Sequence, residues 1–280
     1  MNPKYPVFIP SKKRADSRLT IKMMERYKIP YTVVVEPQEF DVYAAVVDPK
    51  NILVTPHQDK GLVVTRNFIW DYARDHEYKK FWTFDDNIRS IYRLNNNLKT
   101  GVTSGTCLSV IEEFAERYLN LPVVGMNYDF FARRKDGTIP PIVFNTRVYS
   151  CMLIDTFTKD RSGKPFRNEG FYNDDTDLCL RILKDGQCVC YFNSFLIKKM
   201  QTMKIKGGMT EHYLGDGRYK MARELQLKHP DVVKITRKFS KWQHQVDYSS
   251  FRGNKLLRNP DVSIKTGVDN FGLVVRGTVT

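Results

Sequence analysis

The sequence predicts an α/β protein whose doubly wound, mostly parallel sheet is flanked by helices. Strand-like, β-branched segments alternate with amphipathic helical segments through the first half of the chain, which is the pattern of parallel strands joined by helical crossovers. With 280 residues, of which 41% are hydrophobic, the chain is long enough to bury one large core. Asp85 and Asp86 directly follow a strand-like segment, and ligands of such sheets bind beyond the carboxyl ends of strands.

The elements of the first half follow from periodicity and from residues that favour strands or helix ends. Segments rich in Val, Ile, Phe and Tyr are typical of buried strands, and the fourth of them ends at Asp85. Between them, apolar residues recur at helical spacing. We expect strands at residues 7–11, 31–37, 51–56 and in the segment 79–85, and helices at residues 15–27 and 61–76.

The second half is less regular but keeps the same two kinds of element. A helix is expected to begin at Asn173 or Asp174 and to continue to Lys184, because polar residues that cap helices precede it and Gly186 follows. The other expected elements are helices at 104–120 and 217–228, strands at 122–128 and 187–197, and a strand or hairpin at 143–154.

We expect one domain with an extension. Residues 1–215 form the predicted catalytic domain, and residues 216–280 form a basic C-terminal extension packed on it. The sequence has no apolar segment of the roughly 18 residues that span a bilayer, which favours a cytoplasmic protein without a membrane partner. Its five scattered cysteines predict free thiols in a reducing compartment.

Positive charge is concentrated near the C-terminus. The formal net charge is +14, and residues 198–258 hold 15 basic and 5 acidic side chains. A basic surface of this kind favours partners rich in phosphate, nucleic acid first. The alternative is a surface that only keeps the protein soluble.

Two acidic clusters carry the chemistry that the sequence suggests. Asp85, Asp86 and Asn87 offer the oxygen ligands that Mg²⁺ or Mn²⁺ prefers, although an exposed acidic turn would look the same. Arg66, in the preceding helical segment, is expected at the same end of the sheet, where it could meet phosphate oxygens. The second cluster, around Asp175, lies in a helix's first turn; it could supply a general base or only favour the helix dipole.

The order of these motifs resembles the GT-A glycosyltransferases, especially the large family-2 type. The motifs are VVVEP, GLVVTRN, FWTFDDN and NDDTDLCLRILKDG, followed by a strand and a histidine, and the resemblance covers residues 5–215. Thr65 stands where Ala is usual and Asp174 where Glu is usual, both mild changes. The spacer between the motifs is built differently, which leaves the acceptor pocket unassigned.

The resemblance implies a reaction and a role for each matching residue. A sugar nucleotide would donate the sugar, a divalent cation and an arginine would neutralise the leaving diphosphate, and a carboxylate would deprotonate the acceptor hydroxyl, with inversion at the anomeric carbon. The implied roles are nucleotide binding for Ser11, Arg14, Glu36 and Arg66, ribose binding for Asp85, metal binding for Asp86, Asn87 and His212, and general base for Asp175.

The C-terminal region narrows the resemblance to the TET-associated glycosyltransferases of tailed phages. Residues 226–235 and 241–251 resemble that group's C-terminal region, and no membrane-anchor segment is evident. The resemblance implies 5-hydroxymethylcytosine in DNA as acceptor, a UDP-linked glucose or pentose such as arabinose as donor, and action in the host cytoplasm. Aromatic residues could stack the target base, although such residues more often lie in a core; the candidates are Tyr128, Phe130, Phe131 and Trp242.

Three other interpretations remain open from the residues. The same fold could glycosylate a polysaccharide or another acceptor that is not a nucleic acid. A nucleotidyltransferase would also use two carboxylates, but it should carry a Gly-rich loop near the first strand, and residues 9–17 contain no glycine. A non-catalytic nucleic-acid-binding protein would explain the basic charge but not the two acidic clusters.

Overall fold

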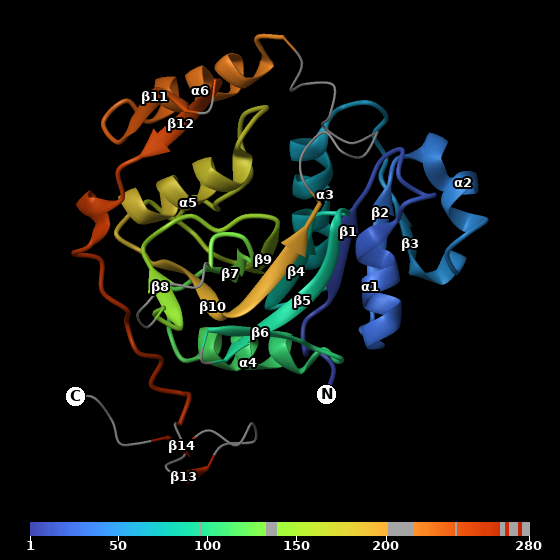
Figure 1. Ribbon diagram of the computed structural model, residues 1–280, viewed down its shortest axis with the longest axis horizontal. Coiled ribbons are helices and arrows are strands. Elements are labelled where there is room, and N and C mark those ends of the chain that lie inside the picture. Colours follow the sequence, from blue (N-terminus) through green and yellow to red (C-terminus); the bar gives the residue numbers. More distant parts are fainter. Residues whose placement is uncertain are drawn as a thin grey trace.

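The computed structural model of this chain describes residues 1–95, 97–132, 139–200, 215–238 and 240–263, together with two short strands beyond them. Its main feature is a mixed sheet of ten described strands with helices on both faces (Figure 1). The strands of this sheet are β1 (Val7–Pro10), β2 (Thr32–Val35), β3 (Ile52–Val54), β4 (Lys80–Phe84), β5 (Ile88–Asn95), β6 (Leu98–Gly101), β7 (Val123–Tyr128), β8 (Ile142–Phe144), β9 (Cys151–Asp155) and β10 (Val189–Lys199).

The strand order places the ends of distant segments at one edge of the sheet. The order is β3-β2-β1-β4-β9-β7-β10-β5-β6, and β8 pairs with β10 outside this path. β1 is parallel to β2 and β4, and β7 is parallel to β10. β9 is antiparallel to both of its neighbours, β4 and β7. The start of β9 therefore lies at the edge where β1, β4, β7 and β10 end.

Alternate side chains of the central strands enter hydrophobic cores on opposite faces of the sheet. In β4, Phe81 packs with Trp70 of α3, whereas its neighbour Trp82 lies in the core that contains Leu108 of α4. This alternation is the two-residue period of a strand buried on both faces. The helices are α1 (Leu19–Tyr27), α2 (Phe40–Ala44), α3 (Leu62–Asp75), α4 (Thr106–Glu116), α5 (Asp174–Lys184) and α6 (Gly217–Lys228), with short 3₁₀ helices η1 (Pro37–Glu39), η2 (Pro49–Asn51) and η4 (Ser249–Phe251).

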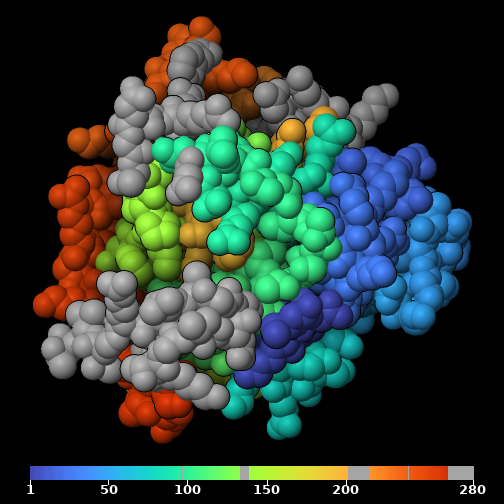
Figure 2. All heavy atoms as spheres, turned by 60° about the horizontal axis from the view of Figure 1, so that its bottom comes forward, coloured from blue at the N-terminus to red at the C-terminus, as the bar shows by residue number. Residues whose placement is uncertain are grey.

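The described C-terminal region lies against the preceding chain. After α6, strands β11 (Val233–Lys238) and β12 (Lys241–Val246) form an antiparallel hairpin. The Asn145 side-chain nitrogen donates to the carbonyl oxygens of Phe251 and Asn254, at 3.0 and 2.9 Å. Figure 2 shows this C-terminal segment as a red band along one flank of the molecule. Farther along, β13 (Gly267–Val268) pairs with β14 (Val274–Val275).

The predicted α/β architecture is confirmed, and most expected elements are present. The helix expected from Asn173 or Asp174 to Lys184 matches α5. The helix expected from residue 15 begins only at Leu19, because Arg18 has a φ of 26°, outside the right-handed helical region. Residues 143–154, expected as a strand or hairpin, contribute to two strands that do not pair with each other: β8 pairs with β10, and β9 pairs with β4 and β7.

Some strands escaped the sequence analysis. β5, β6 and the β11–β12 hairpin contain many charged and polar residues, so their hydrophobic alternation is weak. β5 pairs with β10, a strand about a hundred residues later in the chain, and local patterns carry no information on such partners.

The sequence predicts that the chain lacks a membrane-spanning segment and that its cysteines are free thiols. Within the described ranges, none of the helices combines the length and the apolar character that crossing a membrane requires. All five cysteines are free and buried, as the scattered spacing predicted.

Gly125 in β7 tests how tightly the sheet packs. A Cβ atom at Gly125 would lie 2.2 Å from both the Cys151 carbonyl oxygen and Val148 Cγ1, so the backbone would have to move. We expect Gly125→Ala to lower the free energy of unfolding by about 2 kcal/mol, as measured by denaturant titration. Gly101→Ala is the control, because nothing lies within 4 Å of its Cβ position; equal effects of the two changes would contradict the prediction.

Candidate active site

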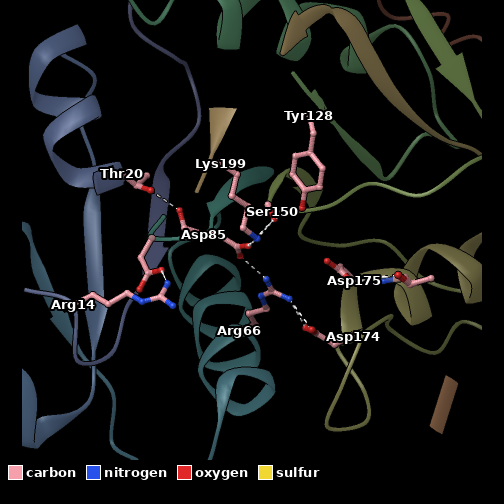
Figure 3. A network of polar contacts seen from close by, with 11 residues as sticks. Arg14, Thr20, Arg66, Asp85, Tyr128, Ser150, Asp174, Asp175 and Lys199 are labelled. Carbon is pink, nitrogen blue, oxygen red and sulfur yellow. Dashed lines mark hydrogen bonds and ion pairs between the residues drawn. The ribbon is translucent and has the colours of Figure 1, made fainter. Parts of the chain in front are cut away.

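The turn after β4 holds two carboxylates with different partners: Asp86 contacts Ser11 and Arg14, and Asp85 contacts Arg66 and Lys199 (Figure 3). The backbone of this turn is fixed from two sides. The Asp85 N–H donates to the Ser150 carbonyl oxygen at 2.7 Å, and Thr20 Oγ donates to the Asp85 carbonyl oxygen at 2.6 Å. The Ile88 N–H in turn donates to Thr20 Oγ at 2.9 Å. The start of α1 and the start of β9 therefore hold the turn, and the two side chains diverge from it.

Asp86 faces the loop that follows β1. Ser11 Oγ donates to Asp86 Oδ2 at 2.8 Å, and Arg14 forms an ion pair with Oδ1. Ser11 Oγ also lies 2.6 Å from the Tyr43 hydroxyl. Burial raises the pKa of Asp86, and the attraction of Arg14 only partly opposes it. The structure thus brings together three of the residues predicted to bind nucleotide or metal.

Asp85 faces the opposite way and is surrounded by donors. Its carboxylate accepts from Arg66 Nη2 at 3.0 Å, Ser150 Oγ at 2.6 Å and Lys199 Nζ at 2.6 Å. Burial alone would raise the pKa of Asp85, but the positive charges of Lys199 and Arg66 outweigh it and hold the pKa well below its usual range. Asp85 is therefore a permanent anion between two cations.

Arg66 joins this turn to the start of α5. Its guanidinium is buried, and Nη1 lies 2.7 Å from both oxygens of Asp174 while Nη2 contacts Asp85. The buried carboxylate of Asp174 and the half-buried carboxylate of Asp85 compensate this buried cation, as a charge removed from water requires. Gly61 before α3 has a φ of 90°, a conformation that favours glycine, so the GLVVTRN motif encodes the turn that positions Arg66.

Asp175 is the half-buried carboxylate of this cluster. Its Oδ1 accepts from the Thr176 N–H at 2.7 Å, and its Oδ2 has no hydrogen-bond donor among the described residues. Burial and the negative charge of Asp174 raise the pKa of Asp175 to about 7, although Arg66 opposes the shift. A carboxylate with such a pKa can accept a proton near neutral pH, as the general base predicted at this position must.

The third aspartate of the α5 start has a structural contact instead. Asp177 is buried, and its oxygens lie 3.0 Å from His229 Nε2 and 2.9 Å from Arg181 Nε. His229 directly follows α6, so Asp177 holds α5 and α6 together. The three aspartates at the start of α5 thus have different contacts: Asp174 binds Arg66, Asp175 accepts from the Thr176 N–H, and Asp177 joins α5 to α6.

Glu36 lies at the end of β2, beside the loop of Ser11. It is buried and accepts from Lys12 Nζ at 2.7 Å, Gln38 Nε2 at 2.5 Å and the Asp59 N–H at 3.1 Å. Polar groups that end neighbouring parallel strands form the usual ligand-binding edge of such a sheet. Glu36 and Ser11 therefore lie at this edge, and their role in nucleotide binding stays a prediction.

In the described part of the chain, the predicted metal ligands do not form a metal site. The oxygens of Asp86 contact Ser11 and Arg14, and those of Asp85 contact two cations and a hydroxyl. The Asn87 side-chain oxygen is buried without a hydrogen-bond partner, but no group of three His, Cys, Asp or Glu residues that could hold a metal occurs in the described ranges. His212 lies outside the described residues.

Ser150 and Lys199 are site residues that the sequence analysis missed. Ser150 precedes β9, and Lys199 is the last residue of β10. The one signal that could have found them is their position in the sheet. Lys199 ends a strand that finishes at the ligand edge, and Ser150 precedes a strand that begins there because it is antiparallel. The sequence did not reveal that β9 is antiparallel.

Among the solved structures that match this chain, two examples have low sequence identity to it. One is A197 from STIV, with 14% identity and a TM-score of 0.38, over 70% of this chain and 85% of that protein. The other is a Bacillus anthracis protein assigned as a glucose-1-phosphate thymidylyltransferase and crystallised with sucrose. It has 10% identity and a TM-score of 0.39, over 81% of this chain and 96% of that protein. No curated protein matches.

A family model gives the clearest comparison. It describes a TET-associated glycosyltransferase and matches residues 5–208, more than half of the chain. The matched range contains both acidic clusters and every predicted site residue except His212. This match confirms the resemblance that the order of the motifs suggested. The chain belongs to the TET-associated glycosyltransferase family and is a glycosyltransferase.

Proposed function

We propose that this enzyme transfers a sugar from a UDP-sugar to the hydroxymethyl group of 5-hydroxymethylcytosine in DNA, with inversion at the anomeric carbon. The observation that carries the proposal is the charge arrangement at the sheet edge. Asp85, Arg66 and Asp174 form a fixed, buried network beside Asp175, whose pKa is raised to about 7. On one side of the site, Arg66 and Lys199 could turn positive charge toward an anionic donor, and on the other side Asp175 offers a proton acceptor.

The donor would bind across the ends of β1, β2 and β4. Glu36 and Ser11 are assigned to the nucleotide, with Arg14 beside them on Asp86. Arg66 and Lys199, on either side of Asp85, supply positive charge for the diphosphate. Positive groups held in place before the reaction stabilise a developing negative charge without reorganisation.

The chemical step would be a single displacement. Asp175 takes the proton of the acceptor hydroxyl as the hydroxyl oxygen forms a bond to the anomeric carbon. The bond between that carbon and the diphosphate oxygen breaks, and the electron pair leaves with UDP. A base with a pKa near the operating pH suits this proton transfer.

The metal requirement stays a prediction from the sequence. Mg²⁺ or Mn²⁺ would help to neutralise the diphosphate, but Arg14 and Lys199 now occupy the carboxylate oxygens of Asp86 and Asp85. A metal at either aspartate would require those side chains to turn away. Transfer assays in the presence of EDTA or of added Mn²⁺ test this requirement directly.

DNA as the acceptor is supported by the β11–β12 hairpin and α6. Lys238 and Lys241 are paired across the hairpin and exposed. The Arg237 guanidinium lies 5.8 Å from the ring of exposed Trp242, and Tyr219 of α6 packs edge-on against that ring at 5.3 Å. Cations mixed with aromatic rings suit phosphates and unstacked bases. We further propose that residues 216–280 act as a DNA-binding extension of a catalytic region, residues 1–215.

The acceptor and the donor can be identified in one experiment. The protein is incubated with DNA that contains 5-hydroxymethylcytosine, with a panel of sugar nucleotides, and the digested nucleosides are weighed. We expect a hexose or pentose mass on hydroxymethylcytosine and none on cytosine. Transfer to an oligosaccharide or wall polymer but not to DNA would instead establish the alternative acceptor class.

Asp175→Asn should remove the base but keep the donor site. We expect kcat to fall at least about 100-fold, while donor affinity, measured by calorimetry, stays within about threefold, because Asp175 does not contact the cations assigned to the diphosphate. Glu113→Gln, at a partly exposed position on α4 where the side chain contacts only Arg117 among the charged groups that the structure describes, is the control. Wild-type turnover in Asp175→Asn would disprove the assignment.

The pH profile of the wild-type enzyme provides an independent test. A general base works only when deprotonated, so kcat/KM should fall about tenfold per pH unit below pH 7 and level off above it, since the pKa of Asp175 is about 7. A profile that is flat from pH 5 to 7 would contradict the assignment.

Neutralising the basic C-terminal surface should weaken DNA binding. We expect a variant with Lys238→Gln, Lys241→Gln and Arg252→Gln to lose affinity and to show a salt dependence flatter by up to about one unit of slope per lost phosphate contact. Lys22→Gln with Lys28→Gln near α1, on the other side of the molecule in Figure 1, is the control. If the salt dependence of DNA binding is unchanged in the triple variant, these three charges serve solubility and do not contact DNA.

A further inference from the structure

We infer that Phe130, Phe131 and Arg147 form a stacking platform that receives the target base after it has left the DNA helix. This inference rests on the proposed function and assigns its acceptor subsite, which neither the motifs nor the family match locates. The platform is built from the turn after β7 and the loop before β9, two segments that meet at the ligand edge of the sheet.

The two phenylalanines are exposed although they are large and apolar. Both residues lie in the tight turn that follows β7, in which the Phe131 N–H donates to the Tyr128 carbonyl oxygen at 3.1 Å. Phe130 is 52% exposed and Phe131 is 47% exposed. Hydrophobic side chains that gather in a rigid, exposed turn commonly mark an interaction site.

The rings around this turn are ordered against one another. Tyr128 stacks on Phe130, with centroids 5.2 Å apart and planes at 23°, and on Tyr149, at 6.0 Å and 25°. Phe130 and Phe131 touch, with centroids 4.3 Å apart. The planes of Phe130 and Phe131 are tilted by 52°, so Phe131 borders the other rings at an angle. The parallel rings of Tyr128, Phe130 and Tyr149 offer flat faces to another planar ring.

Arg147 completes the platform with a positive charge. Its guanidinium carbon lies 5.1 Å from the Phe131 ring centroid and 5.4 Å from that of Tyr149. Arg147 forms no ion pair with any carboxylate in the described part of the chain. A guanidinium that is planar, weakly hydrated and free of a carboxylate can stack on a base or bind its phosphate. A planar guanidinium favours a nucleobase, which has a π face to stack on, over a sugar ring, which has none.

The platform is directly connected to the proposed catalytic groups. The Tyr128 hydroxyl lies 2.7 Å from Ser150 Oγ, which donates to Asp85, and Lys199 Nζ lies 5.8 Å from the Tyr128 ring centroid. Burial is the main cause of the raised pKa of Tyr149, and the negative charge of Asp175 contributes to it as well. A base stacked on these rings would therefore have its hydroxymethyl group close to both Asp175 and the donor.

The hairpin that is proposed to bind DNA borders the same surface. Val148, which follows Arg147, belongs to the same hydrophobic core cluster as Val233 of β11, and Val246 of β12 packs against this cluster. In agreement with this packing, burial and the positive charge of Arg147 lower the pKa of His244 in β12. Phosphates held by the hairpin and a base held by the platform would thus belong to one continuous surface. A base must leave the stack to be modified by an enzyme, and a flat aromatic surface offsets part of the stacking that it loses.

The test separates acceptor binding from donor chemistry. We expect Phe130→Ala with Phe131→Ala to raise the KM for hydroxymethylated single-stranded DNA roughly tenfold or more, with the slow hydrolysis of the UDP-sugar and its affinity unchanged. Phe130→Tyr with Phe131→Tyr should restore the KM, whereas Phe130→Leu with Phe131→Leu should not, because leucine keeps apolar volume but cannot stack. A wild-type KM in the alanine variant would overturn the inference.

Two controls keep the result independent of folding and of the proposed function. Phe157→Ala changes an equally exposed phenylalanine just after β9, at the opposite edge of the sheet, and should change nothing. Fluorescence anisotropy with unmodified single-stranded DNA needs no transfer, and the alanine variant should bind it more weakly than wild type. If the alanine variant loses this binding and the wild-type protein transfers no sugar to the DNA, only the proposed function is overturned. If the alanine variant binds the DNA as tightly as wild type, the platform is overturned.

Discussion

The buried guanidinium of Arg66, held between Asp85 and Asp174, is the interaction on which the rest of the site depends. It joins the end of a central strand to the start of a helix more than eighty residues later. Without it, the buried carboxylate of Asp174 would lose its cation, at a cost of several kcal/mol, and of its two cations Asp85 would keep only Lys199. The same cation opposes the raised pKa of Asp175, so Arg66 sets both the geometry and the charge of the proposed base.

The two adjacent aspartates serve different parts of this edge because their turn is clamped by Thr20. Asp86 joins Ser11 and Arg14 on the side of β1, and Asp85 joins Arg66 and Lys199 on the side of β10. Each carboxylate is neutralised by protein cations, so the acidic motif does not make the edge repel an anionic donor. The basic surplus of the chain has two locations, since a few cations are buried among these carboxylates and many more are exposed near the C-terminus.

The family establishes a sugar-transferring enzyme, and the surface around the site gives reasons to look for a nucleic-acid acceptor. Ordered aromatic rings and Arg147 adjoin the acidic cluster on one side and the basic hairpin on the other. Such a surface combines the two features that bind unstacked nucleic acid, namely planar rings for bases and positive charge for phosphates. The polar network from Tyr128 through Ser150 to Asp85 connects this surface to the donor side.

Local patterns were enough to predict the α/β class, α5 from its first to its last residue, and the placement of Asp85 and Arg66 at one end of the sheet. Those features depend on periodicity, capping and residue order, which short segments carry by themselves. Only the tertiary structure could show that Ser150 and Lys199, 65 and 114 residues after Asp85, complete the site. Their contacts arise because β9 is antiparallel between β4 and β7, and pairing between distant strands depends on the packing of the whole sheet rather than on any local pattern.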